Sequence, residues 1–299
     1  IAHVVALGAD HMIVKRSADP RNRGARFYSV KLRKHFFCFI CLTLLVCVVY
    51  RGMHVRNYAD IKRKKNTMKL LTSGNAKIVK GEKFGYLTQG IHFAPSNLSG
   101  YNVCAWASQG CAMACLNTSG RGKMKSIQDS RINKTRSFFE DKQGFLCNLV
   151  KEIESACKRA DKKNLKPCFR LNLTSDLPWE NIRCNDGQNI FEKFPQVQFY
   201  DYTKGFKRME KYLNGEMPRN YHLTFSRSES NDQQVRLVLA MGGNVAVVFR
   251  NELPKQWEKR KVIDGDESDL RFNDPQGCVV GLVEKGDAKK DSSGFVVTL

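Results

Sequence analysis

The chain has 299 residues, of which 42% are hydrophobic and 26% are charged, with 22 glycines and 8 prolines. This composition excludes a disordered or fibrous protein and allows a core of useful size. The formal net charge of +21 favours an anionic partner, either a nucleic acid or a phosphorylated small molecule, although a solvated Lys-rich surface would have the same composition. The sequence contains no repeat of fixed period, so we expect one domain with an appendage.

Residues 1–67 differ from the rest of the chain. They hold 14 Lys or Arg against three Asp, and residues 1–29 have neither helical nor strand periodicity. An apolar run of about 15 residues follows between basic flanks, in KLRKHFFCFICLTLLVCVVYRG, and it is short for a membrane span of about 20 residues. We expect a poorly ordered or membrane-associated extension here, and no membrane association for residues 68–299.

A second interpretation treats residues 1–67 as an upstream reading frame translated by mistake. The run IKRKKNT directly before Met68 can be encoded almost entirely by purines, as a bacterial ribosome-binding site is. Met68 would then be the true start, and Cys38, Cys41 and Cys47 would have no role. Under both interpretations the functional domain is residues 68–299, and we expect residues 1–67 to be dispensable.

From Met68 onward, short apolar runs alternate with amphipathic stretches, which predicts an α/β fold. The first strand is predicted in FGYLTQGIHFAP, and two helices follow over residues 126–139 and 141–163. The second helix carries Phe145, Leu149, Ile153 and Cys157 on one face. Further strands are predicted, in chain order, in CFRLNLTSD, VQFYDYTK, YHLTFSRSE, NVAVVFR and GCVVGLVEK.

Three of these predicted strands end in polar side chains. Asp176 follows the first of the three, Lys204 follows the second, and Arg227 and Glu229 follow the third. In parallel α/β sheets and barrels the active site forms at the carboxyl ends of the strands. We therefore expect these four side chains to converge on one cavity, although a surface ion pair would explain any one of them equally well.

Three closely spaced cysteines follow the first predicted strand. Cys104, Cys111 and Cys115 form the pattern C-x6-C-x3-C, and small, polar residues surround them in the sequence. A structural zinc site usually has four protein ligands, and His92 is the one further candidate nearby. A [4Fe-4S] cluster is held by Cys thiolates, and a set of three leaves one iron open to a small ligand. The spacing therefore predicts that these three cysteines bind such a cluster.

The other cysteines of this region are Cys147, Cys157, Cys168, Cys184 and Cys278, and each is isolated in the sequence. Free cysteine behaves as a small hydrophobic residue, so we expect these five to be buried thiols. Because the chain has no convincing secretory signal, we expect a reducing compartment, the cytoplasm of a bacterial host, where disulfides are rare.

The sequence from Lys69 to the C-terminus resembles the gene-product-eighty-eight family of phage and prophage proteins. The resemblance is carried by CAWASQGCAMACLNTSGRG, RINKTRSFFED, RLNLTSDLPWE, FYDYTK, YHLTFSRSE, VIDGDESDLRF and GLVEKGDAKKDSSGFVV. This family has no established activity, so the resemblance identifies relatives without assigning a reaction.

More distantly, the cysteine triad after a first strand and the run NLTSDLPWE resemble radical S-adenosylmethionine enzymes. That resemblance implies a partial (β/α) barrel, cluster ligation by Cys104, Cys111 and Cys115, and S-adenosylmethionine at the open iron. The chain departs from the usual C-x3-C-x2-C of that superfamily, and Ala114 stands where an aromatic residue usually precedes the last cysteine.

Two functions follow as hypotheses. The first is a phage iron-sulfur enzyme that modifies a nucleotide, a nucleic acid or another phage-related target. In that enzyme Asp176 and Glu229 would bind the cofactor, and Lys204 and Arg227 would be catalytic and face an anionic substrate. The second is a non-catalytic nucleic-acid-binding protein with a structural zinc site, for which KGFKRMEKYLNGEMPRNYH offers basic residues interleaved with aromatics.

Overall fold

The structure is a computed structural model that describes residues 3–6, 11–15, 27–31, 68–72, 74 and 79–299. Two compact units divide the chain at residues 67 and 68, where the sequence also changes character. The predicted apolar run lies within residues 32–67, outside the described residues. Among the helices of the described part, none is long and apolar enough to cross a membrane.

In the first unit, three strands form an antiparallel sheet: β1 (His3–Ala6), β2 (His11–Lys15) and β3 (Phe27–Lys31). The sequence shows no strand periodicity over residues 1–29, so these three strands were not predicted. The strands are only four or five residues long, and so short a run contains too few residues for a period to be recognised.

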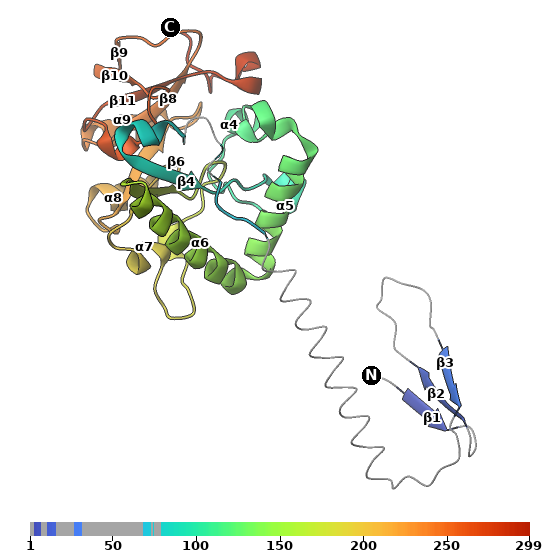
Figure 1. The fold of residues 1–299 in the computed structure, drawn as a ribbon. Coiled ribbons are helices and arrows are strands. Elements are labelled where there is room, and N and C mark those ends of the chain that lie inside the picture. The colour runs from blue at the N-terminus through green and yellow to red at the C-terminus, as the bar shows by residue number, and fades with distance from the viewer. Residues whose placement is uncertain (1–2, 7–10, 16–26, 32–67, 73, 75–78) are drawn as a thin grey trace. The chain divides into compact units, whose positions relative to one another are not determined.

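The second unit is built around an eight-stranded, mostly parallel sheet (Figure 1). The strands are β4 (Tyr86–Gly90), β5 (Lys166–Arg170), β6 (Gln198–Thr203), β7 (Tyr221–Ser226), β8 (Val245–Phe249), β9 (Gln256–Trp257), β10 (Arg260–Asp264) and β11 (Val279–Val283). Their order in the sheet is β4-β5-β6-β7-β8-β11-β10-β9. The six predicted strands are all confirmed, and five of them, β4 to β8, are neighbours in chain order.

The helices between these strands vary in length. The α-helices are α3 (Ser96–Ser99), α4 (Gln109–Met113), α5 (Lys125–Glu140), α6 (Lys142–Lys162), α7 (Ile190–Lys193), α8 (Phe206–Leu213) and α9 (Asp232–Ala240). The 3-10 helices are η1 (Lys80–Phe84), η2 (Leu116–Thr118), η3 (Gly120–Lys123), η4 (Trp179–Asn181), η5 (Arg271–Asn273) and η6 (Gly286–Lys290). Both predicted helices, α5 and α6, are confirmed.

The main hydrophobic core lies between the sheet and the helices α6 to α9. Phe145, Leu149 and Ile153 of α6 are buried in it, as their spacing predicted. Alternate residues of the strands, such as Phe199 of β6 and Phe225 of β7, face the same core. Figure 1 shows α6, α7 and α8 along this side of the sheet.

The opposite face of the sheet is covered by the segment around η5. Asp269 accepts hydrogen bonds from Tyr200 Oη at 3.0 Å and Arg170 Nη1 at 3.1 Å, and Leu270 packs against Tyr200 and Cys168. Because both faces are covered, the parallel strands are buried on both sides, which is the usual condition for a parallel sheet.

The hairpin of β9 and β10 was missed by the sequence analysis. Glu258 and Lys259 form its two-residue turn with φ of 48° and 58°, the positive values that a type I′ turn requires. Asn and Gly usually fill these positions, so Glu-Lys gives no hairpin signal. Strand β10 then pairs in parallel with β11, which lies between β10 and β8.

Candidate cysteine-centred site

The three cysteines lie in the connection between β4 and α5, at the carboxyl edge of the sheet. Cys111 is in α4, whose N-cap residue Ser108 accepts a hydrogen bond from the Cys111 backbone N–H at 3.2 Å. Cys115 follows α4 directly, and Cys104 precedes it. The thiol of Cys104 donates to the Thr174 carbonyl at 3.9 Å, so it contacts the loop after β5.

The three thiols are close enough to interact electrostatically, and all three are half-buried and free. Burial raises the pKa of Cys104 to about 12, and the neighbouring Asp176, Cys115 and Cys111 contribute in the same direction. Burial also raises the pKa of Cys115, against a hydrogen bond from the Asn117 backbone. Without a bound cation or cluster, Cys104 and Cys115 are therefore held as neutral thiols.

Glu229, from the loop after β7, holds the start of α4. Its carboxylate accepts hydrogen bonds from the Gly110 N–H at 2.7 Å and from Ser108 Oγ at 2.8 Å. Burial opposes ionisation of Glu229, but these two donors outweigh it and lower its pKa. A Cβ atom at Gly110 would lie 2.8 Å from Glu229 Oε2, so this contact requires glycine. Glu229 thus fixes the cysteine-bearing helix, and its proposed contact with a cofactor stays a prediction.

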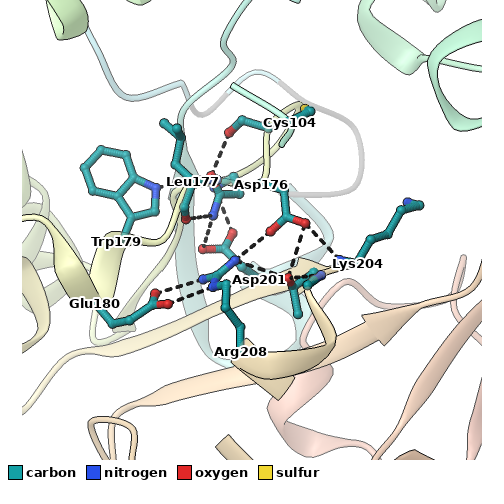
Figure 2. Close-up of polar contacts among 12 residues, drawn as sticks. Cys104, Asp176, Leu177, Trp179, Glu180, Asp201, Lys204 and Arg208 are labelled. Carbon is teal, nitrogen blue, oxygen red and sulfur yellow. Dashed lines mark hydrogen bonds and ion pairs between the residues drawn. The ribbon is translucent and has the colours of Figure 1, made fainter. Parts of the chain in front are cut away.

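Asp176 joins the loop after β5 to the loop after β6, as Figure 2 shows. Its Oδ1 accepts from Arg208 Nη1 at 2.6 Å, and its Oδ2 accepts from the Lys204 N–H at 2.8 Å and from Thr203 Oγ1 at 3.2 Å. Its own N–H donates to the Val103 carbonyl at 2.8 Å, next to Cys104. Burial raises the pKa of Asp176, and Arg208 opposes that shift. In this structure Asp176 therefore positions the cysteine loop.

Arg208 of α8 is the centre of a buried charge network that the sequence analysis missed. Besides Asp176, its guanidinium binds both oxygens of Glu180, at 2.7 and 2.9 Å, and donates to Tyr221 Oη at 3.1 Å. Tyr221 in turn donates to Asp201 Oδ2 at 3.1 Å. Burial acts to lower the pKa of Arg208, but Tyr221 and the carboxylates outweigh it and raise the pKa. The one sequence signal for this network is Glu180 in the run LPWE, because an acidic residue directly after a tryptophan that is buried needs a cationic partner.

Lys204 and Arg227 occupy different environments. Lys204 is half-buried, its Nζ donates to Ser226 Oγ at 3.0 Å, and it lowers the pKa of both Cys104 and Cys115 against the larger effect of burial. Arg227 binds Asp232 through Nε at 2.9 Å and the Phe295 carbonyl through Nη1 at 3.1 Å. Arg227 thereby ties down the C-terminal segment. The four predicted polar residues do lie at one sheet edge, whereas a shared cavity stays a prediction.

Two further cations of α5 are buried. Arg131 interacts electrostatically with Cys115 and forms no ion pair within the described residues, whereas Lys134 interacts with Glu152. Arg131 and Lys134 of α5 are each 7% exposed. Arg131 Nη1 donates to Asn117 Oδ1 at 2.9 Å, and Asn117 is the residue whose backbone hydrogen-bonds Cys115. Burial lowers the pKa of Lys134 to about 8. Burial, followed by the charges of these two cations, also lowers the pKa of His92 to about 3, so His92 is neutral.

In the part of the chain that the structure describes, no three His, Cys, Asp or Glu side chains are arranged to hold a single metal ion. A tetrahedral zinc ion brings its sulfur ligands to about 3.8 Å from one another, because each Zn–S bond is about 2.3 Å. In a [4Fe-4S] cluster each cysteine binds a different iron, so the sulfurs lie wider apart. The three thiols interact with one another, and Arg131 and Lys204 lie within electrostatic reach of them, so these donors fit an anionic thiolate-bound cluster.

The remaining cysteines are partly as predicted. Cys168 and Cys278 are buried, Cys157 and Cys184 are half-buried, and Cys147 is exposed. The expectation of burial is therefore wrong for Cys147, because its position on α6 faces away from the core that Phe145 and Leu149 enter.

The fold and the site define an α/β protein with a mostly parallel sheet and a cysteine-bearing loop at the carboxyl edge of that sheet. Residues 68–299 match the family model described as Gene product 88, and the chain belongs to this phage protein family. Neither a curated protein nor a solved structure matches the chain.

Proposed function

We propose that this protein is an iron-sulfur enzyme that holds a [4Fe-4S] cluster through Cys104, Cys111 and Cys115. One observation carries the proposal. Three free thiols that interact with one another lie beside Arg131, a buried cation that forms no ion pair within the described residues and interacts electrostatically with Cys115. A buried cation without a counter-charge is unfavourable, and a thiolate-bound cluster would supply the missing negative charge.

The order of the strands supports a partial (β/α) barrel of the radical S-adenosylmethionine type. Strands β4 to β8 are parallel neighbours in chain order, as in a singly wound barrel, whereas a doubly wound sheet reverses direction at its middle. The cysteine loop follows β4, the first of these strands. Cys104, Cys111 and Cys115 would hold the cluster, which would supply an open iron for S-adenosylmethionine and one-electron chemistry dependent on an external reductant.

The residues of the sheet edge would then have separate tasks. Lys204 would face an anionic group, because its ammonium lies within electrostatic reach of Cys104 and Cys115. Asp176 and Glu229 would act on the cofactor mainly through the loop that they hold. The substrate would be a nucleotide, a nucleic acid or another anionic phage-related molecule, since residues 68–299 carry 36 Lys or Arg against 26 Asp or Glu. We place this activity in the cytoplasm of a bacterial host, where thiols stay reduced.

The alternative is a non-catalytic nucleic-acid-binding protein with a structural zinc site, which the stretch KGFKRMEKYLNGEMPRNYH suggested. Phe206, Tyr212 and Leu213 of the stretch that suggested it pack against the core. Its exposed face therefore presents Lys207 and Lys211 without the aromatic side chains that would stack on bases.

Anaerobic purification of the full chain, followed by metal and sulfide analysis, tests the proposal. We expect a brown protein with close to four iron and four acid-labile sulfide ions per chain, as the cluster stoichiometry requires. Replacing any one of the three cysteines by Ala should diminish both, whereas Cys157→Ala should change neither. Stoichiometric zinc without sulfide, or iron retained by the triple Ala variant, would refute the cluster and favour the binding protein.

A further inference from the structure

Trp106 lies two residues after Cys104, and its ring is fixed on one face. Ring atoms of Trp106 would be only 3.0 to 3.1 Å from a Cβ atom placed on Gly205. The Arg208 guanidinium lies 5.6 Å from the ring centroid, a cation-π distance. Trp106 is nevertheless 38% exposed, so part of the ring is covered by these residues and part of it reaches solvent.

The backbone of Gly205 does not require glycine. Its φ of −73° and ψ of 100° are open to every residue, so the missing side chain is explained by the contact with Trp106. Arg208 is itself held by Glu180 and Asp176, and it cannot swing away from the ring. The indole is therefore a rigid, preorganised platform beside the cysteine site.

The segment 106–127, which begins with this tryptophan, is basic and unusually apolar for a surface. No acidic residue occurs in the sequence from residue 83 to residue 128, and Arg121, Lys123 and Lys125 are all exposed. Lys125 lies 3.4 Å from Asp129 in a solvent-exposed i,i+4 pair, which is weak enough for a phosphate to replace. Of the eleven large exposed hydrophobic side chains in the described residues, five lie in this segment, with Met113 at 62% and Leu116 at 51% exposed. Such a concentration marks a contact surface, and its charge fits a polyanion.

We propose that the segment 106–127 binds single-stranded nucleic acid, with one base stacked on the open face of Trp106 and the phosphates neutralised by Arg121, Lys123 and Lys125. A fixed aromatic ring with basic neighbours is the arrangement by which proteins bind unpaired bases. A duplex would hide the base face that Trp106 needs. The inference rests on the proposed function only in taking the cysteine site as the reactive centre next to which the base is placed.

Binding is measured by fluorescence anisotropy of a labelled 20-nucleotide single strand with the full chain at several salt concentrations. The same strand should quench the tryptophan emission of the exposed Trp106, because Trp179 is fully buried. Trp106→Ala should weaken binding by about 5- to 100-fold, as expected for one base-aromatic stack, while Trp106→Phe should retain most of the affinity. Trp257→Phe, at a half-buried tryptophan on β9, is the matched control and should bind normally.

Charge reversal tests the phosphate contacts. Lys123→Glu with Lys125→Glu should weaken binding by about tenfold or more, and should reduce the slope of log K against log salt by about 1.4 for two contacts to a single strand. Lys158→Glu with Lys162→Glu makes the same change in net charge on exposed positions of α6, which leads to the amino edge of the sheet. That pair should alter the slope by much less.

Two results would overturn the inference. One is affinity that does not depend on Trp106, with equal losses from both charge-reversed pairs, which would mean attraction to any polyanion. The other is no binding to the single strand, with binding instead to duplex DNA, an acidic protein or anionic vesicles. Iron and sulfide are measured on the same samples. Absence of single-strand binding by protein that contains the cluster refutes only this inference, whereas wild-type protein without iron refutes the proposed function.

Discussion

Replacing Arg208 by Met should be among the most damaging single changes in this protein. Arg208 is the shared cation of Asp176 and Glu180, and all three side chains are at most 12% exposed. Breaking a buried ion pair by removal of one partner costs about 3–5 kcal/mol, because a charge is left buried without compensation. Here two carboxylates lose their common partner, so we expect the free energy of unfolding at pH 7 to fall by about 4–5 kcal/mol.

Urea denaturation measures this loss. With a denaturant slope of about 3 kcal/mol per molar, the urea midpoint should fall by about 1.5 M. The corresponding loss of about 4–5 kcal/mol is a large part of the roughly 5–15 kcal/mol that stabilises a typical domain. Arg208→Lys keeps the charge without the bidentate contact to Glu180 and should be intermediate. Arg236→Met is the control, because Arg236 is 59% exposed and lies 3.8 Å from Glu258, a surface pair expected to contribute less than about 1 kcal/mol.

The double variant Arg208→Met, Glu180→Gln separates the charge effect from the loss of packing. Removing one of the two uncompensated carboxylates should recover part of the stability. A loss below about 1 kcal/mol for Arg208→Met, or no recovery in the double variant, would refute the assignment of Arg208 as the counter-charge.

Three other predictions concern the cysteine loop and the buried cations. Glu229→Ala removes the carboxylate that accepts hydrogen bonds from Ser108 and Gly110, so the variant should retain less iron. Glu229→Gln keeps an acceptor oxygen and should retain part of the iron. Unchanged iron content in Glu229→Ala would contradict the role of Glu229 in holding α4. Burial lowers the pKa of Lys134 to about 8 even though Glu152 opposes the shift, so Lys134→Met should raise the free energy of unfolding at pH 7 by about 1–3 kcal/mol. Thermal unfolding measures this gain, and a destabilised variant would contradict the reasoning. Burial, followed by the charge of Arg271, lowers the pKa of His222 to about 4. The unfolded chain therefore binds more protons than the folded chain between pH 6.5 and pH 4. The free energy of unfolding should fall by up to about 3 kcal/mol as the pH drops through that window. His222→Gln should lack this part of the acid sensitivity, and equal pH profiles of stability would exclude it.

Much of the fold was determined by local sequence pattern. Short apolar runs located β4 to β8 and β11, because a strand buried on both faces needs a continuous run of apolar residues, and the period of Phe145, Leu149 and Ile153 located α6. The polar residues that follow the strands had to lie at one edge, since parallel strands share the direction of their carboxyl ends. The spacing of Cys104, Cys111 and Cys115 was enough to predict a site in the loop after β4.

Tertiary structure decided what these residues contact. The partners of Arg208 lie 28 and 32 residues away in the sequence, and Gly110 and Glu229 are 119 residues apart, so no local period could pair them. The same holds for the interaction of Arg131 with Cys115 and for that of Lys134 with Glu152, which join α5 to parts of the chain 16 and 18 positions away. Sequence pattern reports which face of an element is apolar, whereas the pairing of buried charges depends on which elements meet, and only the folded chain determines that.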